Sequence, residues 1–333
     1  MFISSVAVAG LLGREMQQKL QLPFLQQAFG LLRTFSQFGY RPAMTTKDDM
    51  AAKGWKPFFY GRINSGTPHM QANAWALSLW AGQVTGIKLF SERVYSATRL
   101  LMAKWPNEWT CTEYMSEELA HEVLVLAWLV RVNNTAETRG WLDAVATDLL
   151  KHQRQQIGAI REWVNGTCGL NFLTSNDAYG TSEGGLIQSN TDPAADLLYT
   201  QNFALMSLHE AVHAVGVDSD AGRRYAKAVD GLASFFTRVQ VHSTAQPNLD
   251  GAWLRGIDVE KWEYWASATD SGYGPWETET GWTIGWVSAT LGMREMNTSF
   301  YDTMMSTASV FDSSTVRSVC ADFFEDLAPS VCG

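Results

Sequence analysis

The stretch that decides the fold is ANAWALSLWAGQVTGIKLFSERVYSATRLLM, residues 72–102. Apolar residues recur every three to four positions on each side of Thr85-Gly86, which predicts two helices, Ala72–Val84 and Leu89–Met102. Gly86 can adopt the left-handed backbone that ends a helix, and so short a turn brings the second helix back along the first. The stretch is therefore typical of an αα-hairpin.

The same pattern recurs along most of the chain. Asn133-Asn134-Thr135 separates a second pair of helices, and Gly216 to Asp220 separates a third. From Gly86 to Asn133 the turns are 47 residues apart, and from Asn133 to Gly216 they are 83 apart because a long loop intervenes. Spacings of this size indicate stacked helical pairs. Helical periodicity also covers Leu20–Phe35, Leu119–Val130, Trp141–Leu150, Leu197–Val215, Tyr225–Val239, Thr283–Met293 and Phe300–Val310.

No stretch shows the strict alternation of a strand, so we predict an all-α protein. We expect a single domain over residues 1–333 with four hairpins and an N-terminal helix. Because the chain enters a helical pattern almost at once, it could be the C-terminal part of a longer protein.

Composition restricts the partners. The chain has 34 acidic and 25 basic residues and a net charge of −9, which argues against nucleic acid, since such partners need clustered Lys and Arg. Phe2 to Leu12 is apolar but too short to span a bilayer, so it is either an imperfect signal-peptide core or a buried helix start. Four cysteines follow no metal-binding spacing and allow one disulfide. Three Asn-X-Ser/Thr tripeptides favour an extracellular or periplasmic location.

Residues 251–286 combine aromatic and acidic side chains. Six tryptophans, two tyrosines and six acids share these 36 positions. Sugars present apolar faces and polar rims, so flat rings beside carboxylates suit them. Any one tryptophan is more often a core residue, but the interleaved acids could not all be buried without partners. The candidate sugar-binding residues here are Trp253, Arg255, Trp262, Trp265, Tyr273, Trp276 and Trp282.

Two other segments offer polar side chains for a ligand. The loop SNDAYGTSEGGLIQ, residues 175–188, contributes Asn176, Tyr179 and Glu183 on a glycine-rich backbone, although a solvated surface loop explains it equally well. Arg62 and His69 precede a helix that bears two tryptophans, and His69 could equally be an ordinary helix-start residue.

One exact motif points elsewhere. His209-Glu210-Ala211-Val212-His213 is H-E-x-x-H on a predicted helix, a spacing at which two imidazoles can bind zinc. Gly216 extends the motif, but Ser219 stands where a third ligand would be needed. The alternative is that Gly216 ends the first helix of a hairpin, as Gly86 does. We therefore expect neither a metal nor another cofactor.

Four strings carry a resemblance to a known family: GAWLRGIDVEKWEYW at 251–265, GYGPWETETGW at 272–282, AWLVRVNNTAETRGWL at 127–142 and SNDAYGTSE at 175–183. Over residues 55–295 the chain resembles the catalytic region of six-hairpin glycosidase-like proteins. The resemblance implies an (α/α)6 toroid with a central cleft, complete or truncated here, and glycoside hydrolase or polysaccharide lyase activity, in several members on uronic-acid sugars.

Hydrolysis of a glycosidic bond needs two carboxyl groups, one as acid and one as base or nucleophile. We expect Glu279 and Asp258 to form this pair, with Asp270 as the competitor, because each lies among aromatic residues. Arg255 and Arg62 could clamp a uronate carboxylate. The alternatives are a lyase that uses Tyr179 or His69 and a non-catalytic sugar-binding toroid.

Overall fold

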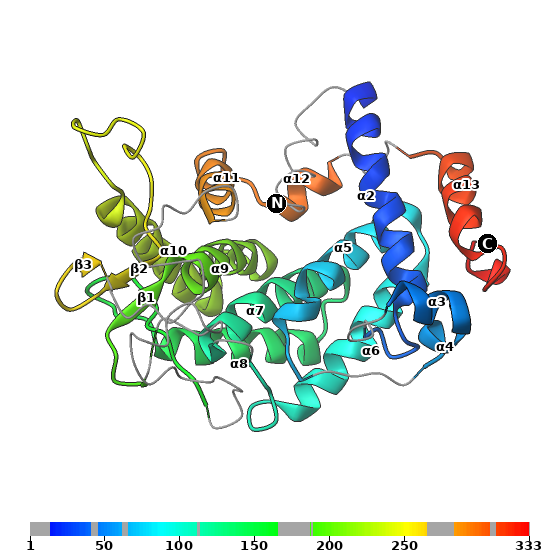
Figure 1. Ribbon diagram of the computed structural model, residues 1–333, viewed down its shortest axis with the longest axis horizontal. Helices are drawn as coiled ribbons and strands as arrows, with labels where there is room; N and C mark the ends of the chain where they lie inside the picture. Colours follow the sequence, from blue (N-terminus) through cyan, green and yellow to red (C-terminus); the bar gives the residue numbers. More distant parts are fainter. Residues whose placement is uncertain are drawn as a thin grey trace.

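Helices form most of the computed structural model, which describes residues 14–40, 46–61, 66–111, 114–165, 187, 189–264, 283–306 and 311–332 (Figure 1). Three of the four predicted hairpins are evident. Helices α5 (His69–Thr85) and α6 (Lys88–Lys104) form the first pair, α7 (Met115–Val132) and α8 (Ala136–Lys151) the second, and α9 (Asn202–Val215) and α10 (Asp220–Val239) the third. The all-α prediction is confirmed.

Local chemistry places the hairpin turns where the sequence predicted them. Gly86 ends α5 in the left-handed conformation, with φ of 73°. Thr135 caps α8 through its side chain in a capping box with Thr138, and Ser219 caps α10 by accepting from the backbone N–H of Gly222. These caps satisfy donors that the first turn of each helix leaves unpaired.

The first helix of each pair lies inside the molecule. Residues Met115 to Val130 of α7 are all buried, and so are Asn202 to Ala211 of α9, whereas the paired helices α8 and α10 bury one face. Contacts run from α5 to α7, from α7 to α9 and from α9 to α11 (Thr283–Glu295), while α12 (Phe300–Met305) returns to α5. The inner helices α5, α7, α9 and α11 thus follow one another around an arc, with α6, α8 and α10 outside.

A small antiparallel sheet was not predicted. Strands β1 (Ala194–Asp196), β2 (Gly256–Asp258) and β3 (Glu263–Tyr264) pair in the order β1-β2-β3, at the left edge of Figure 1. Ala195 lies opposite Ile257, and Ile257 opposite Tyr264. The sheet joins the segment before α9 to the segment after α10. A π-helix, η2 (Leu197–Gln201), connects β1 to α9.

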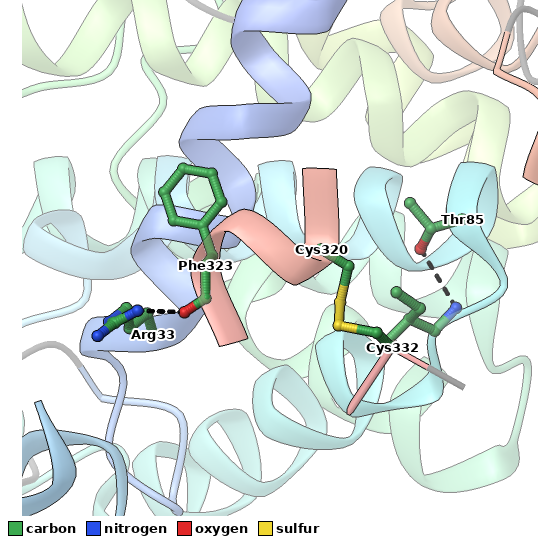
Figure 2. The surroundings of a disulfide bond; sticks show 6 residues. Arg33, Thr85, Cys320, Phe323 and Cys332 are labelled. Atoms are coloured by element: carbon green, nitrogen blue, oxygen red, sulfur yellow. Dashed lines mark hydrogen bonds between the residues drawn. A yellow bond between two sulfur atoms is a disulfide. The ribbon is translucent and has the colours of Figure 1, made fainter. Parts of the chain in front are cut away.

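The two ends of the described chain pack together beside α5. Helix α2 (Arg14–Thr34) contacts α5, α13 (Ser313–Phe324) and the short α4 (Lys56–Phe59), which follows α3 (Lys47–Lys53). The disulfide Cys320–Cys332 joins α13 to η4 (Pro329–Cys332), and Arg33 of α2 donates to the carbonyl of Phe323 (Figure 2). Within the described residues, no helix is both long and apolar enough to cross a membrane.

Candidate active site at the N-terminal ends of the inner helices

Four aromatic rings link the first two turns of the four inner helices. The ring centroid of His69, the first residue of α5, is 5.7 Å from that of His121 on α7. His121 lies 3.8 Å from Phe203 at the start of α9, and Phe203 lies 5.5 Å from Trp286 in the first turn of α11. The inner helices therefore begin at one end of the toroid. We call this the floor, formed by His69, Glu117, Glu118, His121, Glu122, Phe203 and Trp286.

His69 and Glu118 form the polar centre of the floor. Nδ1 of His69 is 2.8 Å from Oε1 of Glu118, and the backbone N–H of His69 donates to Oε2 at 2.7 Å. Burial alone would lower the pKa of His69, but the hydrogen bond and the negative charge of Glu118 raise this pKa to about 9. The imidazole is therefore protonated at neutral pH. Its side chain is 18% exposed, while that of Glu118 is fully buried.

Burial favours the uncharged forms of His121 and Glu122. Burial and the charge of His69 lower the pKa of His121 to about 3. Its Nδ1 donates to the carbonyl of Glu117 at 3.0 Å, which leaves Nε2 as an acceptor. Burial and the charge of Glu118 raise the pKa of Glu122 well above its ordinary value, so this carboxyl group holds its proton more tightly than an exposed glutamate does.

All four inner helices carry buried polar groups that lack a hydrogen-bond partner among the described residues, including Oδ1 of Asn73 and Nε1 of Trp80 on α5. On the other three helices they include both carboxyl oxygens of Glu122 on α7, Nδ2 of Asn202 on α9 and Nε1 of Trp286 on α11. Buried polar atoms are normally paired with protein or water. Those of Asn202 and Trp286 lie in the first turns of α9 and α11, where water or a polar ligand could pair with them.

The same side chains are also close enough together to bind a cation. One ligand atom each from His69, Glu117 and Glu118 lies within 4.8 Å of the others. Imidazole binds a metal only in its neutral form. Because His69 is protonated and already paired with Glu118, a cation would have to displace this proton. The arrangement therefore favours an ion pair over a metal centre at neutral pH.

A buried carboxyl group behind the floor ties the start of α7 to the start of α9. Oε2 of Glu162 accepts from the hydroxyls of Ser116 at 2.7 Å and Thr200 at 2.6 Å. Oε1 accepts from the backbone N–H of Asp196 at 3.0 Å, and Asp196 in turn caps η2 and lies 3.1 Å from Arg255. Burial and the charge of Asp196 raise the pKa of Glu162 to about 8.

Four residues predicted for sugar binding or catalysis lie around the small sheet. Trp253 is buried and donates from Nε1 to the carbonyl of Phe236 at 2.8 Å. Arg255 is fully buried in its ion pair with Asp196. Oδ1 of Asp258, which is also buried, accepts from two backbone N–H groups of the next turn.

Trp262, the fourth of these residues, is exposed. Of the predicted site residues, the structure places His69 in the floor. The other predicted residues lie outside the described part of the chain: Arg62, Asn176, Tyr179, Glu183, Trp265, Asp270, Tyr273, Trp276, Glu279 and Trp282.

The H-E-x-x-H motif is engaged by the protein itself. Glu210 accepts from the backbone N–H of Phe300 at 2.7 Å and of Tyr301 at 3.2 Å, and also from Nε1 of Trp128 at 2.8 Å. Nε2 of His209 donates to the carbonyl of Thr298 at 2.8 Å. The motif therefore fixes the start of α12 against the C-terminal half of α9.

Sequence reasoning missed most of the floor. Glu117, Glu118, His121 and Glu122 lie within SEELAHE, residues 116–122, where an apolar helix continues directly. Four ionisable residues at the start of a helix that is otherwise hydrophobic all round are the signal that could have found them, since charged side chains are rarely buried unless paired.

The comparisons with known proteins agree with the fold. No family model matches the chain, and no curated protein does. The crystal structure of the unsaturated glucuronyl hydrolase from Bacillus sp. GL1, described as responsible for the degradation of glycosaminoglycan, is similar to it with a TM-score of 0.52 and 13% identity, covering 90% of this chain and 77% of that chain.

A structure of a UGL variant with the sugar chain dGlcA-Glc-Rha-Glc is similar too, again with a TM-score of 0.52 and 13% identity, covering 86% of this chain and 71% of that chain. At 13% identity these likenesses show the fold alone, and they agree with the predicted all-α toroid of helical hairpins.

Proposed function

We propose that this protein is a glycoside hydrolase that acts on an oligo- or polysaccharide containing a uronic acid. The observation that carries the proposal is the floor, where a protonated His69 and several carboxyl groups meet at one end of a toroid. The solved structures of this fold include an unsaturated glucuronyl hydrolase, which supports a uronic-acid substrate. His69 offers a positive charge to a substrate carboxylate from the exposed edge of the floor.

The two carboxyl groups of the reaction come, in this proposal, from opposite sides of the substrate. Glu279 stands four residues before α11, whose Trp286 belongs to the floor, and we retain it as the proton donor. Glu118 supplies the second carboxylate from α7, with Asp270 as the next candidate. Asp258 ranks after these, because its Oδ1 already holds the turn that follows β2.

The test is a screen with uronic-acid oligosaccharides that follows the release of reducing ends. On a substrate that is cleaved, Glu279→Gln and Glu118→Gln should each lower kcat by at least about 10²-fold, because proton transfer is lost while side-chain size is kept. Glu263→Gln is the matched control, since this carboxylate is exposed. Full activity of Glu279→Gln with an unchanged melting temperature would reject its role. Binding without turnover across the screen would favour a non-catalytic toroid.

One observation favours β-elimination as a second candidate. The charged His69, at the exposed edge of the floor, could neutralise the carboxylate of a uronate, as elimination requires. Tyr179, the other predicted lyase residue, lies outside the described residues. Elimination leaves a carbon–carbon double bond that absorbs ultraviolet light, whereas hydrolysis leaves a saturated sugar, so the absorbance of the product separates the two reactions.

A further inference from the structure

Trp262 adopts a backbone conformation that its residue type disfavours. Its φ is 59°, in the left-handed region, where a residue with a bulky side chain costs roughly 1–2 kcal/mol relative to glycine. The residue ends the β2–β3 turn, in which Oδ1 of Asp258 accepts from the backbone N–H of Glu260 and of Lys261, both at 2.9 Å. Trp262 itself donates from its backbone N–H to the carbonyl of Asp258 at 2.9 Å.

The side chain gains little burial in return. Trp262 is 44% exposed, which makes it one of the most exposed large hydrophobic residues that the structure describes. The guanidinium carbon of Arg238 lies 4.7 Å from the ring centroid of Trp262. The ring centroid of Phe235 lies 6.4 Å from that of Trp262. A strained position that presents an aromatic ring to solvent is more typical of a functional site than of a structural one.

A groove shares Arg238 with this ring. It has a volume of about 590 Å³ and is lined by residues that include Gln155, Gln156, Ser234, Thr237 and Arg238. Arg238 belongs to both features, since it lies over the ring and donates to the carbonyl of Ile157, which also lines the groove. The groove therefore offers amide, hydroxyl and guanidinium groups, and the one carboxylate among its described lining residues, Asp230, is paired with Arg294 at 2.7 Å.

We propose that Trp262 and this groove form a carbohydrate-binding site for acidic sugar chains, separate from the floor. The ring supplies a stacking platform for the apolar face of a sugar, and the amides and hydroxyls meet its rim. Arg238 favours a chain that carries carboxylates. The site lies at the last turn of the outer helix α10, so it does not share residues with the floor, and it does not depend on the proposed hydrolase activity.

Trp262→Gly gives a sharp test, because it removes the ring and also relieves the backbone strain. Trp55→Ala is a matched control, since Trp55 lies under Arg33 in the same way, with 4.8 Å between guanidinium carbon and ring centroid. Native gel electrophoresis in polygalacturonate, with dextran as the neutral polymer, measures the binding. Trp262→Gly should weaken the retardation by polygalacturonate about fivefold or more, at an unchanged or higher melting temperature.

The retardation should be unchanged in Trp55→Ala. The part of the retardation that Trp262→Gly removes belongs to this site and not to the floor, because Trp262 is not a floor residue. Trp262→Asn, which also tolerates the left-handed conformation, should behave like Trp262→Gly. Three outcomes would overturn the proposal: no retardation of the wild type, equal retardation of wild type and Trp262→Gly, or a marked loss of melting temperature in both Trp262 variants.

Discussion

Replacing Glu118 by glutamine tests the ion pair at the centre of the floor without any substrate. In the wild type, Glu118 raises the pKa of His69 from 6.5 to about 9 against the opposing effect of burial. This difference of about 2.5 pH units corresponds to roughly 3 kcal/mol of coupling between protonation and folding. Glutamine keeps the side-chain size and a hydrogen-bonding oxygen but removes the charge. Burial lowers the pKa of His69, and in the variant the charge of Glu118 no longer opposes this effect. The pKa of His69 should therefore fall to 6.5 or below.

The sign of the effect on stability follows from the direction of the shift. The folded state holds the His69 proton more tightly than the unfolded state, so this contribution is fully present below pH 6.5 and is lost as the pH rises to about 9. The difference in unfolding free energy between wild type and Glu118→Gln should therefore shrink over this window. Comparing the two proteins cancels other groups that titrate in the same range.

NMR titration of the histidine rings and urea unfolding at a series of pH values measure the two quantities. Glu263→Gln, which removes an exposed carboxylate, should leave both curves unchanged. A wild-type His69 that titrates near pH 6.5, or an unchanged titration in Glu118→Gln, would refute the ion pair as the source of the charge.

Three further changes probe the framework around the floor. In the wild type, the raised pKa of Glu162 makes its contribution to the unfolding free energy disappear as the pH rises from 4.5 to about 8. Glu162→Gln should flatten this decrease, which urea unfolding at a series of pH values measures. Glu210→Ala should lower the unfolding free energy by about 3 kcal/mol or more, because it leaves three buried N–H donors without an acceptor. A melting temperature that barely changed would contradict this. The double change Cys320→Ser and Cys332→Ser should cost about 3 kcal/mol by freeing a loop of 12 residues, as seen by urea unfolding under non-reducing conditions.

The helical architecture could be predicted because its signals are local. Periodicity of apolar residues, Gly86 as a left-handed helix end and Thr135 as a cap each act within a few residues, and each has its predicted role in the structure. The small sheet could not be predicted in this way. Its strands are two or three residues long, too short to show alternation, and β1 pairs with β2 across a separation of about 60 residues.

The site was harder to predict, because residues that are concentrated in one stretch of sequence need not have side chains that lie together in the fold. The aromatic and acidic segment 251–286 led to the prediction that Trp253, Arg255 and Asp258 face a sugar, yet all three side chains are buried with protein partners. The floor arises from residues of α5, α7, α9 and α11 that are distant in sequence. Only the packing of the helices brings them together, and no single stretch contains that information.

Carboxylates at the inner helix ends have two physical causes, which the hydrogen bonds separate. The N-terminus of a helix carries a partial positive charge, so acids gather there for stability alone. Asp196 is such a group, since it caps η2 and pairs with Arg255, and Glu162 is held by hydroxyls and a backbone N–H. Both groups are buried and held by protein donors.

Glu122 differs from these framework acids, because its oxygens have no partner among the described residues. The pair of Glu118 with His69 differs in another way, because its imidazole reaches the surface. A substrate carboxylate that approached from this edge would meet the charge of His69 first and would compete with Glu118 for it. Release of Glu118 from that hydrogen bond would then free a carboxylate at the moment of binding, which is why we place Glu118 in the reaction, and not Glu162, which is held by protein donors.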